Sequence, residues 1–314
     1  MSMLSSVAER LYWMSRYLER TQDTARLIQS YNHLIMDIPK GAEPPWDIMI
    51  DILDARPLFR DSFKTGSEHS VLKFLIADNK SSCGIPFAVR AARENVRTTR
   101  DVLPEEAWEL VNGLHLFVED HAKNASGRRN RHNFLSEVIS RCQMINGLFA
   151  ASLPRDHAYG FIKLGRLVEC ADMTTRIMDV GARDIMERAG RFGTIDPLLW
   201  GALLQALSAA AAYRREVGPI IEKDAALNFI FLSSTFPRSI KYFVRETRKE
   251  LMRLNNHDLA MRAVERLSRR LARLDTEHSS SVELHEYIDD FQLQLISLDA
   301  VSYTHLRAHE TRIH

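Results

Sequence analysis

The chain has 314 residues, and its 45% hydrophobic content can fill a large core, which excludes a disordered protein. Its 42 Lys and Arg against 41 Asp and Glu leave a formal net charge of +1, which excludes a bulk field that recruits nucleic acid or an anionic membrane. Three scattered cysteines favour reduced thiols over a disulfide framework. With charges throughout the first twenty residues and no apolar stretch of about 20, we expect a cytoplasmic protein without a signal peptide or membrane span.

Helical periodicity runs along most of the chain. Apolar side chains recur at steps of three and four over residues 7–28, 264–274 and 284–298, as on the buried face of a helix. Pro104, followed by two acids, and Asp196-Pro197 have the residue types that begin helices. Polar segments at 39–45, 123–133 and 188–194 predict loops, and nothing reads as alternating strands. The pattern predicts an all-α, multi-helix bundle.

The two halves of the chain resemble one another. Charged side chains of the first helix recur 150 residues later, where Arg16, Glu19 and Arg26 fall on Arg166, Glu169 and Arg176. Shifts of 154 and 155 continue the match, with Trp46 on Trp200 and Ile85 on Ile240. We interpret this as an ancient duplication with halves at 1–152 and 153–300, related by a pseudo-twofold axis. Chance similarity among amphipathic helices is the alternative.

Residues 301–314 have no counterpart in the first half. Their sequence, VSYTHLRAHETRIH, breaks the helical pattern and looks like translated sequencing-adaptor read-through. We therefore expect a non-native tail, a missing natural C-terminus and no function for the histidines in it. A genuine disordered tail is the alternative.

The repeated Arg and Glu residues share one face of their helix. At about 100° per residue, Arg16, Glu19 and Arg26 lie within a quarter turn of one another, away from the apolar stripe. One hypothesis is a pocket in which arginines grip a carboxylate or phosphate. The other is an Arg–Glu network that joins the two halves, because one glutamate between two arginines needs no ligand.

The two copies of this face differ in polarity. The first copy has Tyr12 and Asp23 on its face, so we expect it to meet a ligand or partner. The second copy places Glu169 among apolar residues, Ile162, Met173 and Val180, so we expect that copy to be structural.

Motifs for cofactor and metal chemistry are missing. The chain contains no Glu-x-x-His, Gly-x-Gly, Gly-Lys-Ser/Thr, Cys-x-x-Cys or His-Glu-x-x-His sequence, so we predict neither a cofactor nor a metal site. Cys170 beside Glu169 could be a nucleophile, but a small packed thiol fits better without a nearby histidine. Arginines over 262–273 could follow a phosphate backbone, although the intervening Glu265 favours an ordinary solvated face and argues against nucleic acid as a partner.

Three segments carry a family resemblance. The opening AERLYWM and RYLER sequences with Thr24-Ala25-Arg26, the segment with Arg93 and Glu94, and the segment GRLVE at 165–169 together resemble the bacterial alpha-E family, named for its Glu-Arg motif. The resemblance covers residues 1–300. It departs from the family pattern at Cys170, where the second copy should have Arg after Glu169.

The resemblance implies an all-helical partner of ATP-grasp peptide ligases, encoded beside transglutaminase-like proteins. We therefore expect an accessory or substrate-presenting subunit of a peptide-ligation or peptide-modification system rather than an enzyme. The alternatives are an enzyme that acts on a peptide carboxylate through the Arg/Glu face, and a nucleic-acid-binding helical protein. No catalytic residue is assigned, and the predicted binding residues are Tyr12, Arg16, Glu19, Arg26, Arg93, Glu94, Arg166, Glu169 and Arg176.

Overall fold

A computed structural model describes residues 4–188, 195–254, 257–276 and 280–308. Within these ranges every regular element is a helix, which confirms the all-α prediction. The first seven α-helices are α1 (Ser5–Asp37), α2 (Ile48–Ile52), α3 (Arg56–Ser62), α4 (Glu68–Leu72), α5 (Ile85–Arg97), α6 (Glu105–Ala125) and α7 (Arg128–Ser152), with a π-helical turn η1 (Lys73–Ala77) and a 3-10 turn η2 (Arg100–Val102) among them.

The second part of the chain begins with α8 (His157–Arg176), which continues through a π-helical turn, η3 (Ile177–Ala182), into α9 (Arg183–Arg188). It then forms α10 (Asp196–Ala206), α11 (Ala210–Glu216), α12 (Lys223–Leu232), α13 (Ile240–Leu251), α14 (Asp258–Leu271) and α15 (Ser281–Ala308). Two of these helices begin at side-chain caps, where Asp156 accepts a hydrogen bond from the Tyr159 amide and Ser239 from the Tyr242 amide.

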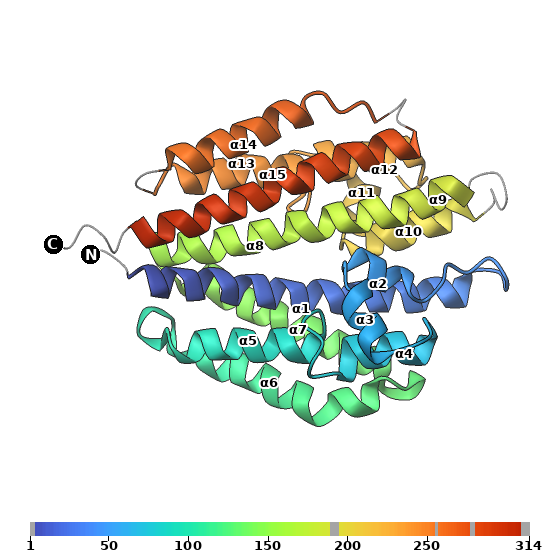
Figure 1. Ribbon diagram of the computed structural model, residues 1–314, viewed down its shortest axis with the longest axis horizontal. Helices are drawn as coiled ribbons and strands as arrows, with labels where there is room; N and C mark the ends of the chain where they lie inside the picture. Colours follow the sequence, from blue (N-terminus) through green and yellow to red (C-terminus); the bar gives the residue numbers. More distant parts are fainter. Residues whose placement is uncertain (1–3, 189–194, 255–256, 277–279, 309–314) are drawn as a thin grey trace.

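Helices α1 and α8 form the centre of the molecule and run side by side in the same direction (Figure 1). Helices α5, α6 and α7 lie on the α1 side, and α13, α14 and α15 on the α8 side. The two central helices touch at Gly165, where an added Cβ would overlap the Tyr12 carbonyl oxygen and Ser15 Oγ. Only glycine allows this approach, which brings the charged side chains of both helices within reach of one another.

The order of helices repeats along the chain. Helices α3 and α11 begin 154 residues apart, α5 and α13 155 residues apart, and α7 and α15 153 residues apart. The turns before α3 and α11 also match, since Asp54 (φ 51°) and Ser208 (φ 56°) both adopt a left-handed conformation there. A left-handed conformation is uncommon for residues other than glycine. Its recurrence in the turns before α3 and α11 is therefore a second similarity between the two halves, beside the order of helices.

Two sequence expectations about chain breaks are wrong. Residues 123–133 are mostly helical, because α6 ends at Ala125 and α7 begins at Arg128. The helix expected to break at Val301 continues, since α15 ends at Ala308. Of the third predicted loop, residues 189–194 lie outside the described ranges, as do residues 309–314 of the predicted tail. None of the described helices combines the length and hydrophobicity that a bilayer span requires.

Candidate functional site between α1 and α8

Two buried glutamates face each other across the contact of α1 and α8. Arg16 Nε of α1 donates to Glu169 Oε2 of α8 at 2.7 Å, and Arg166 Nε of α8 donates to Glu19 Oε2 of α1 at 3.1 Å. On each helix the glutamate follows the arginine by three residues, and each arginine donates to the glutamate of the other helix. We call these two contacts the reciprocal Arg–Glu pairs. Because Glu19 is 0% exposed and Glu169 1% exposed, neither carboxylate has water to replace its arginine.

Each of the two glutamates also accepts hydrogen bonds from a second arginine. Arg20 donates to Glu169 through Nε at 2.5 Å and through Nη2 at 3.0 Å. Arg238, from the turn before α13, donates to Glu19 through Nη2 and to Asp23 Oδ1 through Nη1 at 2.6 Å. Two guanidinium groups per carboxylate satisfy the buried charge, as desolvated ions require.

Arg238 explains the departure from the family pattern at Cys170. The 150-residue shift places Cys170 on Arg20, and the 155-residue shift places Arg238 on Cys83. Under these shifts arginine and cysteine stand in exchanged positions, and the second arginine reaches Glu19 from a turn instead of from the central helix. The sequence carries this signal, but only a comparison of both positions together shows it.

We call the reciprocal Arg–Glu pairs together with Arg20, Asp23 and Arg238 the Arg–Glu cluster. The charges of this cluster set the pKa values of its acids. Burial acts to raise the pKa of Glu19, but the guanidinium groups of Arg238 and Arg166 outweigh it and lower the pKa to about 2. For Glu169, burial is likewise outweighed by Arg20 and Arg16, so its pKa is also lowered. Both carboxylates stay ionised at neutral pH.

Asp23 behaves in the opposite way. Burial raises its pKa to about 7, since a single arginine, Arg238, opposes the desolvation and the nearby Glu19 adds repulsion. Among the described residues nothing donates to Asp23 Oδ2. The charge of Asp23 therefore changes near neutral pH.

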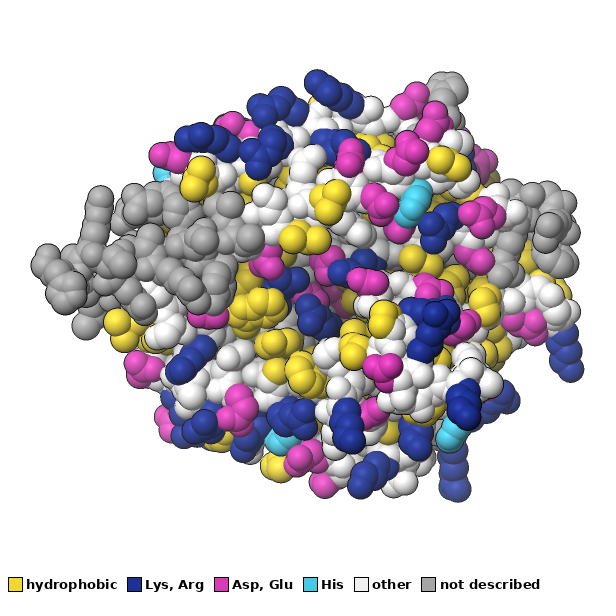
Figure 2. All heavy atoms as spheres, viewed as in Figure 1, with side chains coloured by type: hydrophobic (Ala, Val, Ile, Leu, Met, Phe, Trp, Pro, Cys, Tyr) yellow, Lys and Arg dark blue, Asp and Glu magenta, His cyan; other side chains and the backbone are white. Residues whose placement is uncertain are grey.

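One edge of the cluster reaches solvent beside α15. Asp299 of α15 accepts hydrogen bonds from Tyr12 Oη and from Arg16 Nη1, the latter at 2.8 Å, and the Arg16 guanidinium lies 4.9 Å from the Trp13 ring centre. The side chains of Asp299 and Arg20 are 28% and 24% exposed. We call Tyr12, Trp13, Arg16, Arg20 and Asp299 the α15 edge. Figure 2 shows a hollow over α1 and α8 in which charged and hydrophobic side chains meet.

The structure brings together five of the nine predicted binding residues: Tyr12, Arg16, Glu19, Arg166 and Glu169. Arg26 lies at the margin, where its Nε is 3.3 Å from the Gln22 side-chain oxygen once that amide is turned to face it. Arg176 pairs with Asp172 at 2.9 Å instead of with either glutamate. Arg93 and Glu94 of α5 pair with each other at 2.9 Å on the surface.

The two copies of the face do not form separate sites, so the expected division between them stays a prediction. Tyr12 belongs to the cluster of Glu169, through Asp299 and Arg16, and not to that of Glu19. Glu19 itself has no exposed surface, so the copy predicted to meet ligand holds its carboxylate away from solvent. The reason is that the helices exchange partners, so the residues beside one glutamate in sequence surround the other in space.

Cys170 has the environment of a packed thiol. Burial raises its pKa well above the usual value, and the adjacent Glu19 charge raises it further. A thiol with a raised pKa carries little thiolate at neutral pH and is a poor nucleophile.

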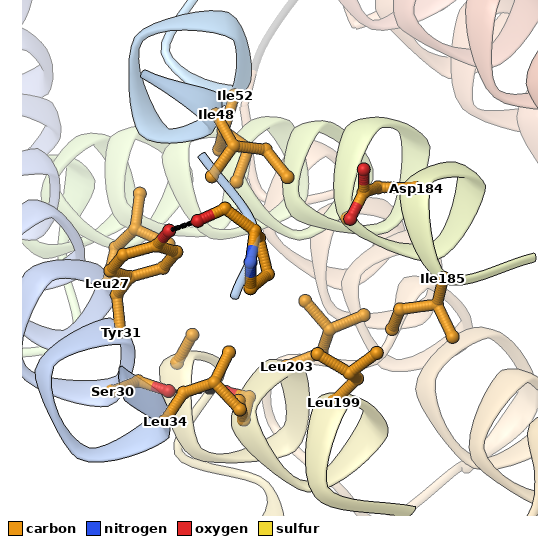
Figure 3. Close-up of a pocket in the computed structure, with 14 residues that line it drawn as sticks. Leu27, Ser30, Tyr31, Leu34, Ile48, Ile52, Asp184, Ile185, Leu199 and Leu203 are labelled. Atoms are coloured by element: carbon orange, nitrogen blue, oxygen red, sulfur yellow. Dashed lines mark hydrogen bonds between the residues drawn. The ribbon is translucent and has the colours of Figure 1, made fainter. Parts of the chain in front are cut away.

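A separate cavity lies between the second half of α1, α2, η3 and α10 (Figure 3). Its volume is about 40 Å³, and its wall is mostly apolar, with Leu27, Leu34, Ile52, Leu199 and Leu203 among the lining residues. A space of this size and polarity is a packing void and not a ligand site.

The fold and the cluster define a class: an all-helical protein whose two central helices are joined by buried Arg–Glu pairs. Residues 3–305 match the family model Alpha-E, described as a predicted alpha-helical domain with a conserved ER motif. The chain therefore belongs to the Alpha-E family, as its opening motif predicted. No curated protein and no solved structure matches the chain.

The family description names an ER motif, and α1 contains two such dipeptides, Glu9-Arg10 and Glu19-Arg20, of which the second lies in the Arg–Glu cluster. Glu19 accepts from Arg166 and Arg238, whereas its neighbour Arg20 donates to Glu169. Glu19 is thus the centre of one group of contacts, and the adjacent Arg20 belongs to the group around Glu169. This is possible because consecutive helix positions point about 100° apart.

Proposed function

We propose that this Alpha-E protein is a non-enzymatic accessory subunit of an ATP-grasp-linked peptide-ligation or peptide-modification system, and that its α15 edge binds a peptide carboxylate. The ligase-linked role is taken from the family resemblance, with a transglutaminase-like protein as a further candidate partner. The binding role is argued from the contacts between α1, α8 and α15. The two roles rest on different observations and are tested by different experiments.

The reciprocal Arg–Glu pairs support a structural role for the buried part of the cluster. Each glutamate already has two arginines and no exposed surface, which leaves no place for a ligand. We infer that the chain arose by duplication and that these pairs hold its two halves together across a pseudo-twofold axis. The repeated order of helices and the matching left-handed turns support that origin.

The observation that carries the binding proposal is the position of Asp299. Its carboxylate takes one hydrogen bond from Tyr12 Oη and one from Arg16 Nη1, which is the arrangement of a carboxylate receptor. Asp299 is partly exposed and comes from another helix, so an incoming carboxylate can replace it while Glu169 keeps Arg16 in place. The exposed guanidinium edge of Arg20 adds positive charge beside this position.

Binding fits the cluster better than catalysis does. A general acid or base works best with a pKa near the working pH, whereas the pKa values of Glu19 and Glu169 are lowered by their arginines. Asp23 has a pKa of about 7 but is 1% exposed, so substrate cannot reach it.

Peptide binding by the full chain tests the carboxylate site. A short labelled peptide should bind, and the same peptide with a C-terminal amide should bind at least about 10-fold more weakly, because a lost charged hydrogen bond costs roughly 1.5 kcal/mol or more. Tyr12→Phe should weaken binding about 5-fold, since one neutral donor is worth about 1 kcal/mol. Asp299→Asn should strengthen it, because the competing internal carboxylate loses its charge.

Tyr17→Phe is the matched control, because Tyr17 lies on the same helix outside the α15 edge and packs beside Arg20. It should leave peptide binding unchanged. Equal affinity for the acid and the amide, or no response to Asp299→Asn, would reject the α15 edge as a carboxylate site. The accessory role has its own test: the chain should co-purify from a native host with the neighbouring ligase.

A second candidate function, polyanion binding, is favoured by the outer helix α14. Four exposed arginines follow one stripe of that helix and the turn after it, at steps of four and three, and Figure 2 shows basic side chains gathered over α14. They are Arg262, Arg266, Arg269 and Arg273. Nucleic-acid binding through this stripe would fall steeply with salt, with a log–log slope of about −3 to −4 for four phosphate contacts. The absence of such a slope would remove this candidate.

A further inference from the structure

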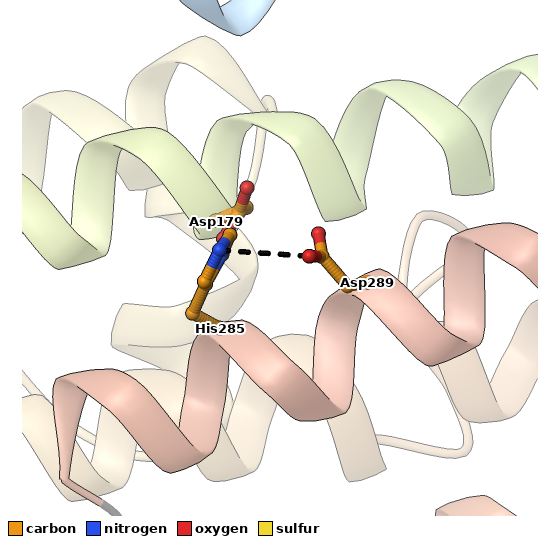
Figure 4. A group of neighbouring side chains, drawn as sticks. All are labelled: Asp179, His285 and Asp289. Carbon is orange, nitrogen blue, oxygen red and sulfur yellow. Dashed lines mark hydrogen bonds and ion pairs between the residues drawn. The ribbon is translucent and has the colours of Figure 1, made fainter.

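A histidine and two aspartates meet between η3 and α15, away from the Arg–Glu cluster (Figure 4). Asp179 comes from the π-helical turn η3, and His285 and Asp289 lie one turn apart on the same face of α15. One ligand atom from each of the three lies within 4.8 Å of the other two. The sequence search for metal motifs missed this group because Asp179 is 106 residues from His285 along the chain.

The two imidazole nitrogens of His285 face different carboxylates. Nδ1 lies 2.5 Å from Asp179 Oδ1, and Nε2 lies 3.5 Å from Asp289 Oδ2. A neutral imidazole has a single N–H donor. The short contact with Asp179 orients the Nδ1 proton toward that carboxylate, so Nε2 faces Asp289, where either a second proton or a cation can lie between the two atoms.

The distance between Nε2 and Asp289 fits a divalent cation in that position. Zinc bonds of about 2.1 Å at a tetrahedral angle separate two ligand atoms by about 3.4 Å, which is close to the 3.5 Å between His285 Nε2 and Asp289 Oδ2. Asp179 then has the role that carboxylates take behind metal-bound histidines: it accepts the Nδ1 proton and fixes the ring. We propose that His285 and Asp289 form a binding site for a divalent transition-metal ion of the zinc class, with Asp179 as the orienting carboxylate.

The exposure of the three side chains fits an open site. Asp179 is mostly buried, His285 is about one third exposed and Asp289 is more than half exposed. A metal ion can therefore enter from solvent on the Asp289 side. Two protein ligands leave the remaining coordination positions to water or to a second molecule, unlike a closed structural zinc site with four protein ligands.

The first half of the chain provides an internal comparison, which rests on the duplication proposed above, whereas the site itself does not. The shifts of 150 and 153 residues place Gln29 on Asp179, His132 on His285 and Ser136 on Asp289. Gln29 Nε2 donates to Ser136 Oγ at 2.9 Å, and neither side chain is a carboxylate. A neutral amide and a hydroxyl are poor zinc ligands, so we expect one metal ion per chain and not two.

Zinc titration by calorimetry tests the site on the full chain. The three histidines nearest the C-terminus are removed from competition, so all proteins carry His305→Ala, His309→Ala and His314→Ala. This parent should bind one zinc ion. Asp289→Asn should weaken binding at least about 10-fold by removing a ligand, and Asp179→Asn about 10- to 100-fold by releasing the ring.

Asp290→Asn is the matched control, since Asp290 is the next acid on α15 and pairs with Arg270 instead. It should bind zinc as the parent does. Circular dichroism of each variant confirms that the fold is retained, and His285→Gln, which cannot ligate through an imidazole, should abolish the one-to-one binding. No saturable one-to-one binding by the parent, or equal zinc affinity in the Asp289→Asn and Asp290→Asn variants, would overturn the proposal.

Discussion

Replacing Glu19 by glutamine removes one charge from the middle of the molecule and changes little else in shape. The side chain is fully buried and accepts from Arg166 Nε at 3.1 Å and from Arg238, which is itself buried. The amide cannot neutralise these two guanidinium groups. Losing one partner of a buried ion pair costs roughly 3–5 kcal/mol.

The pKa of Glu19 gives an independent value for the same loss. Its pKa falls from 4.5 to about 2, and each pH unit corresponds to about 1.4 kcal/mol, so ionisation of this carboxylate contributes about 3 kcal/mol. Because the folded pKa lies below the unfolded one, this stability is fully present above pH 4.5 and is lost as the pH falls toward 2. For a chain of this length, about 3 kcal/mol lowers Tm by about 5 °C.

Urea unfolding and thermal melts at several pH values measure this effect. Glu19→Gln should be less stable than the wild type by about 3 kcal/mol at pH 7, and the difference should shrink below pH 4.5. Glu169→Gln should behave similarly, because Glu169 also holds two arginines. Glu94→Gln is the control, since a surface pair contributes about 0.5 kcal/mol. If Glu19→Gln cost no more than this control, the buried pairs would not hold α1 against α8.

Two further substitutions test the surroundings of the cluster. Asp23→Asn should raise stability increasingly between pH 4 and pH 7, by about 4 kcal/mol at pH 7 and above, because the unfolded carboxyl ionises near its ordinary pKa of 3.8 whereas the folded one stays protonated up to a pKa of about 7. Chemical unfolding that gives the same effect at pH 4.5 and at pH 7.5 would contradict this. Gly165→Ala should cost about 3 kcal/mol by pushing α8 away from the Tyr12 carbonyl. Gly147→Ala, on the open side of α7, should instead stabilise by up to about 1 kcal/mol, and equal effects of both alanines in thermal melts would refute the close contact.

The sequence by itself determined the helices, and it predicts the repeat. Apolar steps of three and four identified the stripes because a helix buries one face, and this local rule needs no knowledge of the partner. The three-residue spacing of Arg16 and Glu19 likewise placed both side chains on one helix face. The sequence also assigned the family, because the motif is contiguous and lies within α1.

Only the tertiary structure decided which charges meet. Arg16 pairs with Glu169 across 153 residues, and Glu19 with Arg238 across 219, because α1 lies against α8 at Gly165 and the turn before α13 closes over Glu19. Burial was equally invisible in the sequence, and it enclosed the carboxylates of both copies alike. Asp299 came from a third helix without any motif. Helix periodicity fixes the direction of a side chain on its own helix, whereas its partner and its exposure depend on how distant helices pack.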